Sequence, residues 1–138
     1  MAARGQVLIY LDSSALVKLV RSEAESPALG RWLGLNPDPV VSSALARTEV
    51  VRAVLNGDER LRDRARSVLA AIDLMPMTND LLDEAAALTN VLRTLDAIHL
   101  ATACRLREDL HAFVAYDKRL LTAAAEVGLL AVAPGADG

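Results

Sequence analysis

Cysteine and aromatic residues are nearly absent from this sequence. Cys104 is the only cysteine, which excludes a disulfide within the chain and a cluster of thiolate metal ligands. We expect Cys104 to be a small buried apolar side chain. Phe, Trp and Tyr together make up 3% of the residues, which leaves few rings on which nucleic-acid bases could stack. The composition fits a reducing cytoplasm and argues against a protein that binds bases mainly by stacking.

The sequence also lacks a long apolar run and an excess of basic charge. The apolar stretch near the N-terminus is interrupted by Asp12 and Lys18 and is too short for the core of a signal peptide. Nothing in the sequence resembles a membrane span. The net charge is −3, whereas a protein that neutralises many nucleic-acid phosphates is usually basic. Any contact with nucleic acid must therefore come from a local group of cations.

What is present is the composition of one globular domain. The hydrophobic fraction is 53% and the charged fraction is 24%, values that differ from those of a disordered chain. A domain near this length buries roughly 68–70% of the surface that its unfolded chain exposes, so that one core is enough. We expect a single domain over residues 1–138, with no internal linker and with a frayed tail at about residues 134–138.

Strand and helix patterns alternate along the chain. Apolar runs typical of strands lie at residues 7–11, 40–43 and 111–116, with shorter extended pieces at 74–78 and 129–133. Helical patterns follow Ser13 and occupy residues 22–32, 43–55, 59–72, 79–90, 94–106 and 118–128. This alternation predicts an α/β fold built from βαβ units, with helices on both faces of a central, mostly parallel sheet of four to five strands.

Four carboxylates stand out because each lies among apolar or small residues: Asp12, Glu49, Asp96 and Asp117. Asp12 and Asp117 follow predicted strands, at the sheet edge where open α/β folds bind ligands. Glu49 lies beside the apolar stripe of a predicted helix, and Asp96 opens a helix that must be deeply packed. Most of the other acids lie in polar stretches, where we expect them to be solvated.

Each of these four acids also has a local explanation. Three of them can cap a helix, and Glu49 can pair with Arg47 or Arg52. Together, however, four unpaired buried carboxylates would cost several kcal/mol each. Carboxylates about 4 Å apart would also repel one another by about 4 kcal/mol at an effective dielectric constant of 20. One divalent cation removes these costs, and ligands that are all oxygen favour a hard cation such as Mg²⁺ or Mn²⁺.

Four sequence segments resemble the signature segments of PIN-domain ribonucleases, and specifically of the VapC-type toxins of bacterial toxin–antitoxin pairs. They are LIYLDSSALVKL, SSALARTEVVRA, LRTLDAIHLATA and FVAYDKRLLTAAA. The segments occur in the family's order and cover nearly the whole chain. The resemblance implies a three-layer α/β/α fold and metal-dependent cleavage of RNA with Mg²⁺ or Mn²⁺. It also implies a homodimer and an inhibitory antitoxin of the VapB type.

The resemblance assigns roles to the four acids. The metal ligands that it implies are Asp12, Asp96 and Asp117. Glu49 would ligate a second ion or accept the proton of the attacking water.

Three further positions bear on the same site. Ser14 matches the family's polar position two residues after the first acid. Relatives often carry Thr or Ser two residues before the last acid, whereas this chain has Ala115, so a hydroxyl contact is not expected there. His99 lies one helical turn after Asp96, so an Asp-x-x-His metal pair is geometrically possible, although a packed histidine is a sufficient explanation.

Arginines supply a local basic region in spite of the negative total. Residues 47–66 hold six arginines against four acids, a local net of +2. We expect part of this group to line a path for RNA phosphates: Arg47, Arg52, Arg62 and Arg66. The alternative is a solvated helix whose charges pair with one another.

Three other interpretations stay open on the residues alone. A haloacid-dehalogenase-like phosphatase has a nucleophilic acid after the first strand and a second acid where this chain has Ser14. A receiver domain requires an acid pair near the first strand, where this chain has Asp12 alone. A PIN-like fold without activity would act only as a binding partner, and the presence of all four acids argues against it.

Overall fold

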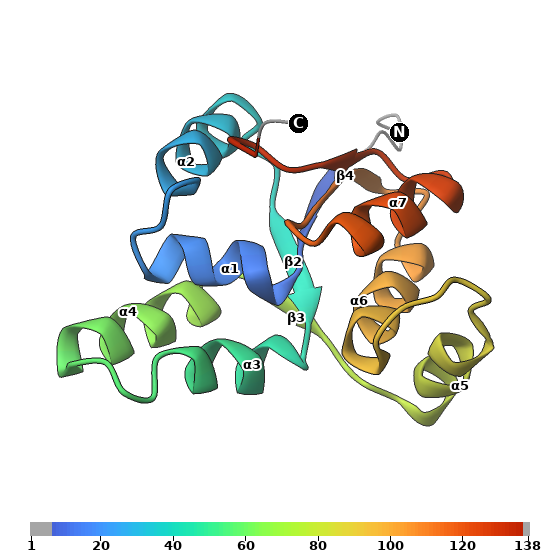
Figure 1. Ribbon diagram of the computed structural model, residues 1–138, viewed down its shortest axis with the longest axis horizontal. Coiled ribbons are helices and arrows are strands. Elements are labelled where there is room, and N and C mark those ends of the chain that lie inside the picture. The colour runs from blue at the N-terminus through green and yellow to red at the C-terminus, as the bar shows by residue number, and fades with distance from the viewer. Residues whose placement is uncertain (1–6, 137–138) are drawn as a thin grey trace, which may run out of the picture.

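A five-stranded parallel sheet forms the centre of the molecule (Figure 1) in a computed structural model that describes residues 7–136. The strands are β1 (Leu8–Leu11), β2 (Val40–Ser43), β3 (Asp73–Met75), β4 (Leu110–Val114) and β5 (Ala131–Val132). Their order across the sheet is β3-β2-β1-β4-β5, and all neighbouring strands are parallel. The predicted mostly parallel sheet is confirmed, with β1 at its centre.

Helices cover both faces of the sheet. Those in the described part of the chain are α1 (Ser13–Val20), α2 (Ser26–Leu35), α3 (Ala46–Ala53), α4 (Glu59–Ala70), α5 (Asn79–Ala87), α6 (Thr94–Arg105) and α7 (Lys118–Glu126). Helices α1 to α4 share one apolar core with the sheet, and α6 and α7 share the other. Helix α5 packs on α6 in a smaller cluster. The three-layer α/β/α fold is therefore confirmed.

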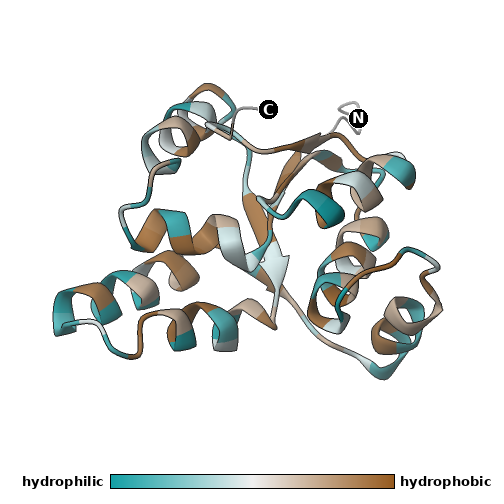
Figure 2. Cartoon of the chain, in the orientation of Figure 1, coloured by the Kyte–Doolittle hydropathy of each residue, from teal (hydrophilic) through white to brown (hydrophobic). Residues whose placement is uncertain are grey.

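Alternation along β1 decides which core each of its side chains enters. Ile9 and Leu11 pack against α1 to α4, whereas Tyr10 packs against α6 and α7, and all three are fully buried. A strand covered on both faces needs apolar residues at every position, which explains its unbroken apolar run. Figure 2 shows the central strands largely in the hydrophobic colour and α4 with alternating colours.

Helix α5 is shorter than its sequence pattern predicts. It ends at Ala87, and Leu88 has an extended backbone with φ −63° and ψ 134°, whereas the pattern continues to Asn90. Thr89 and Asn90 are poor helix formers because their side chains compete for backbone hydrogen bonds or lose rotamer freedom. The resulting non-helical connection leads into α6.

Part of the C-terminal segment packs on the fold. The Tyr116 hydroxyl donates a hydrogen bond of 2.8 Å to the carbonyl of Pro134. Gly135 has φ +87°, and a Cβ at this position would lie 2.7 Å from Cβ of Ala28 in α2. Residues 137 and 138 of the expected frayed tail lie outside the described residues. No helix within residues 7–136 is both long and apolar enough to cross a bilayer.

Candidate functional site

The four singled-out acids line one pocket, although they come from distant parts of the sequence. Its volume is about 160 Å³, and its lining residues are Asp12, Ser13, Ser14, Glu49, Arg93, Asp96, His99 and Asp117. Parallel strands bring their carboxyl ends to one edge of the sheet, and the first acid follows β1 while the last follows β4. Helices α3 and α6 supply the other two acids.

Asp12 is both a helix cap and a pocket acid. Its Oδ1 accepts hydrogen bonds from the backbone N–H of Ala15 at 3.0 Å and from the Ser14 hydroxyl at 2.7 Å. The residue is 4% exposed. Burial raises the pKa of the Asp12 carboxyl above its usual value, although nearby His99 and the two hydrogen bonds act in the opposite direction. The local explanation of Asp12 is thus correct, but it does not account for the cost of burying the charge.

Asp117 uses its two oxygens for different contacts. Oδ1 accepts a hydrogen bond of 3.0 Å from the Leu120 backbone N–H and so caps α7. Oδ2 lies 3.7 Å from Nη2 of Arg93. Two residues before this acid, Ala115 is fully buried in an apolar cluster. The methyl group therefore continues the core at a position where relatives often carry a hydroxyl.

Glu49 is held by two side chains from other helices. Ser13 donates a hydrogen bond of 2.5 Å to its Oε1, and Nε2 of His99 lies 2.9 Å from the same oxygen. Partial burial raises the pKa of the Glu49 carboxyl, but the hydrogen bonds from His99 and Ser13 outweigh this, so its pKa lies below the usual value. Within residues 7–136 the side-chain partners of Glu49 are Ser13 and His99 and not Arg47 or Arg52, so the predicted alternative of pairing with a neighbouring arginine of α3 is wrong.

His99 connects Glu49 to the core. Its Nδ1 lies 2.7 Å from the Tyr10 hydroxyl, and its Nε2 lies 3.1 Å from the Ser13 hydroxyl. Burial raises the pKa of Tyr10 far above the usual value of a phenol, so the hydroxyl keeps its proton and can donate it to Nδ1. Nε2 then carries the imidazole hydrogen and donates to Glu49. Both ring nitrogens are engaged, which favours a packed histidine over an Asp-x-x-His metal pair.

Arg93 is a pocket residue that the sequence analysis missed. It precedes α6, and its Nε and Nη2 each lie 3.2 Å from Oδ2 of Asp96. Its contact with Asp117 makes it a bridge between the two acids, while its own side chain is 74% exposed. The i, i+3 spacing of Arg93 and Asp96 is the signal that could have indicated this pair.

The four arginines predicted to bind RNA do not line the acid pocket. All are exposed: Arg47, Arg52, Arg62 and Arg66. Arg62 donates to the carbonyl of Gly57, and Arg66 pairs with Asp63. These local contacts match the alternative of a solvated helix in part, and the RNA path on this surface stays a prediction.

The donor set of the pocket suits a hard cation, because all four acids offer oxygen ligands. No three His, Cys, Asp or Glu side chains within residues 7–136 converge closely enough to hold one ion between them. Mg²⁺ does not need such a cage, since it keeps several waters and often uses only one or two carboxylates. A pocket of about 160 Å³ has room for several waters. The residues therefore fit an ion held partly through water.

Comparisons with known proteins identify the family of this chain. The model of the family described as PIN domain matches residues 9–126. Ribonuclease VapC46 of Mycobacterium tuberculosis is 51% identical over 127 residues, which cover 91% of this chain and 97% of the relative.

Two solved structures are similar at lower identity. VapC20 of Mycobacterium tuberculosis, described as a sarcin-ricin loop cleaving toxin, matches with a TM-score of 0.71 and 18% identity over 91% of this chain and 99% of its own. A toxin–antitoxin complex from Klebsiella pneumoniae matches with a TM-score of 0.65 and 22% identity over 79% and 86%. These two likenesses concern the fold, whereas the family model and the sequence identity show that this chain belongs to the PIN-domain family, among the VapC ribonucleases.

Proposed function

We propose that this protein is a toxin of a toxin–antitoxin pair, an endoribonuclease that hydrolyses RNA phosphodiester bonds with Mg²⁺ or Mn²⁺. The observation that carries the proposal is the convergence of Asp12, Glu49, Asp96 and Asp117 on one pocket at the carboxyl edge of the sheet. Four acids in so small a space are costly for a chain that does not use them. The 51% identity to a protein named as a ribonuclease supports the same conclusion.

Three of the acids would hold the ion, in part through water molecules: Asp12, Asp96 and Asp117. When bound, the ion would lower the pKa of a water molecule and offset negative charge on the phosphate. Asp12 is oriented for this role by its contacts with Ser14 and Ala15. Its raised pKa means that the folded chain gains from any cation placed beside it.

Glu49 would accept the proton of the attacking water. The carboxylate is ionised at neutral pH, as a general base requires, while its lowered pKa makes it a weaker base than an ordinary glutamate. The hydrogen bonds from Ser13 and His99 fix the carboxylate in place. Fixed orientation of a catalytic group lowers the entropy cost of reaching the transition state.

Arg93 would contact the phosphate that is cleaved. Its side chain is 74% exposed, so it can turn from Asp96 toward an incoming anion without leaving a buried charge unpaired. A guanidinium binds phosphate oxygens in a bidentate manner. A nucleic-acid phosphodiester suits this arrangement, because it can contact both the acids and the guanidinium, and the relative named as a ribonuclease supports RNA as the substrate.

The proposed partners follow from the relatives. We assign this chain an antitoxin of the VapB type, in line with the toxin–antitoxin complex that shares its fold, and a second copy of itself in a homodimer. We place its action in the cytoplasm, where its RNA substrate and antitoxin would be found.

The proposal is tested by RNA cleavage with purified protein. Wild type should cleave RNA in Mg²⁺ and stop in EDTA, and Asp12→Asn or Asp96→Asn should reduce the rate at least about 100-fold because each removes a charge from the pocket. Asp83→Asn is the matched control, since Asp83 is exposed on α5 and lies outside the pocket. Undiminished cleavage by Asp12→Asn, or cleavage that persists in EDTA, would contradict the proposal.

A further inference from the structure

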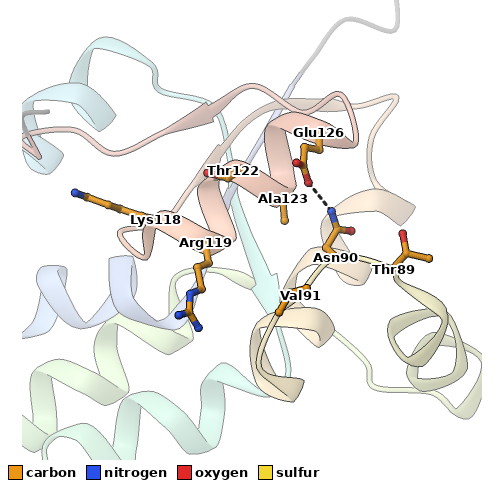
Figure 3. Close-up of a pocket in the computed structure, with 8 residues that line it drawn as sticks. All are labelled: Thr89, Asn90, Val91, Lys118, Arg119, Thr122, Ala123 and Glu126. Atoms are coloured by element: carbon orange, nitrogen blue, oxygen red, sulfur yellow. Dashed lines mark hydrogen bonds between the residues drawn. The ribbon is translucent and has the colours of Figure 1, made fainter.

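A groove larger than the acid pocket lies between α7 and the connection that precedes α6 (Figure 3). Its volume is about 530 Å³, within the range of sites that hold small ligands or single nucleotides. Six of its eight lining residues are polar or charged: Thr89, Asn90, Lys118, Arg119, Thr122 and Glu126. A groove that docks a partner helix is lined mainly by apolar residues, whereas most of the residues that line this groove are polar or charged.

Both chain segments that line the groove also line the acid pocket. Lys118 directly follows Asp117, an acid of the pocket. On the opposite side, Val91 lines the groove and Arg93, two residues later, lines the pocket. The two hollows therefore lie next to each other on both of these chain segments.

The two cations of the groove are free to bind an anion. Lys118 and Arg119 are exposed, and neither side chain forms a hydrogen bond or ion pair within residues 7–136. Glu126 accepts a hydrogen bond of 2.8 Å from Asn90. Figure 3 shows this pair across one end of the groove, with Lys118 and Arg119 extending from the other end of α7. Positive charge thus gathers at the end that adjoins the acid pocket.

We propose that this groove holds the RNA strand beside the phosphate that is cleaved. Lys118 and Arg119 bind backbone phosphates, and Thr89, Asn90 and Thr122 hydrogen-bond sugar hydroxyls or base edges. This inference rests on the proposed ribonuclease function. No aromatic side chain lines the groove, so binding depends on phosphate and sugar contacts more than on stacking. Lys118 and Arg119 also supply local positive charge for binding phosphates in a chain whose net charge is −3.

The test measures RNA affinity at several salt concentrations. Fluorescence anisotropy of a labelled single-stranded RNA is followed with the full chain carrying Asp12→Asn, so that the RNA stays intact. Adding Lys118→Ala and Arg119→Ala should weaken binding about 10-fold at low salt. It should also reduce the slope of log affinity against log salt by about 1.4, since each lost contact to single-stranded RNA accounts for about 0.7. Thr122→Val should weaken binding a few-fold and leave the slope unchanged.

The matched control removes the same charge from surfaces outside both predicted RNA paths. Arg31→Ala with Arg107→Ala also lowers the net charge by two, at exposed residues outside the groove and the acid pocket, and should leave affinity and slope at the values of the Asp12→Asn chain. Equal losses in both pairs would indicate a general charge effect and overturn the proposal. Unchanged RNA affinity in the Lys118 and Arg119 variant would also overturn it, whether or not that variant still binds an antitoxin.

The measurement separates the two proposals. If wild type fails to cleave RNA, the ribonuclease proposal fails, while the binding slopes still report on the groove. If cleavage depends on Asp12 and the slopes do not depend on Lys118 and Arg119, only the groove proposal fails.

Discussion

The guanidinium of Arg93 lies 3.2 Å from the carboxylate of Asp96, and it reaches Asp117 at 3.7 Å. Two of the acids proposed to hold a divalent ion thus share one cationic side chain of the same protein. An ion that enters the pocket competes with Arg93 for these oxygens, because a carboxylate cannot satisfy both cations equally at close range.

Arg93→Met should therefore strengthen metal binding. The variant keeps an unbranched, flexible side chain but leaves Asp96 and Asp117 without their cation, so Mn²⁺ should bind about 5-fold more tightly, or about 1 kcal/mol. Stability should change by less than about 0.5 kcal/mol, since the pair is solvent-exposed on the arginine side. Calorimetric titration with Mn²⁺ measures the affinity. Arg105→Met is the control, because Arg105 pairs with Glu84 outside the pocket, and weaker binding by the Arg93 variant would contradict the expectation.

Asp12→Asn should stabilise the metal-free protein while it abolishes cleavage. Burial raises the pKa of Asp12, so the folded chain binds this proton more tightly than the unfolded chain. As the pH rises from the ordinary pKa of an aspartate through the raised pKa of Asp12, the buried carboxyl ionises and the free energy of unfolding falls. Asparagine caps a helix as well as aspartate does, so at pH 7 in EDTA the variant should gain on the order of 1 kcal/mol.

Thermal unfolding in EDTA at several pH values checks this expectation. The difference in Tm between Asp12→Asn and wild type should narrow as the pH falls, because Asp12 becomes protonated. A saturating concentration of Mg²⁺ should stabilise wild type more than the variant. A variant that is less stable than wild type at pH 7 in EDTA would show that the buried carboxylate carries no such cost.

Ser13→Ala and Ser14→Ala should each loosen one carboxylate of the pocket. Ser13 donates to Glu49 and Ser14 donates to Asp12. Loss of either hydrogen bond should cost about 1 kcal/mol of stability and reduce the cleavage rate about 10-fold. Ser67→Ala is the control, since Ser67 is exposed on α4. Cleavage rates equal to that of Ser67→Ala would show that the two hydroxyls do not position the acids.

Tyr10→Phe should release His99 from a single tautomer. The buried Tyr10 hydroxyl lies against Nδ1 of His99, and its removal leaves this nitrogen without its partner, at a cost of about 1–3 kcal/mol. The ¹⁵N chemical shifts of the His99 ring should then change toward a mixture of tautomers. Tyr116→Phe removes a hydroxyl that bonds to Pro134 instead, and it should leave the His99 signals unchanged. Identical His99 signals in wild type and Tyr10→Phe would contradict the assigned tautomer.

The acids of the pocket could be singled out from the sequence because each follows a local pattern. Asp12 and Asp117 end apolar strand runs, and Asp96 opens a packed helix. Parallel strands bring their carboxyl ends to one edge of the sheet, so the fold class alone predicts that the acids after β1 and β4 lie close together. The sequence allows Asp12 and Asp117 to be either helix caps or metal ligands, and the structure shows that a cap can also be a pocket acid.

The residues that hold the acids could not be found in the same way. Ser13 meets Glu49 across 36 residues of sequence, and His99 meets it across 50. These contacts depend on how α1, α3 and α6 pack together, which no local pattern specifies. Arg93 differs, because its spacing from Asp96 is local, but its approach to Asp117 depends on how the start of α6 lies beside the start of α7.

The most direct test of the account is the position of a bound ion. A crystal grown with Mn²⁺ gives an anomalous signal at the metal, whatever the activity of the protein. The account predicts one signal in the pocket lined by Asp12, Asp96 and Asp117, in contact with their oxygens directly or through water, with Arg93 turned away from Asp96. The account would be contradicted by a crystal saturated with Mn²⁺ that gives no anomalous signal in this pocket and in which Arg93 still contacts both Asp96 and Asp117.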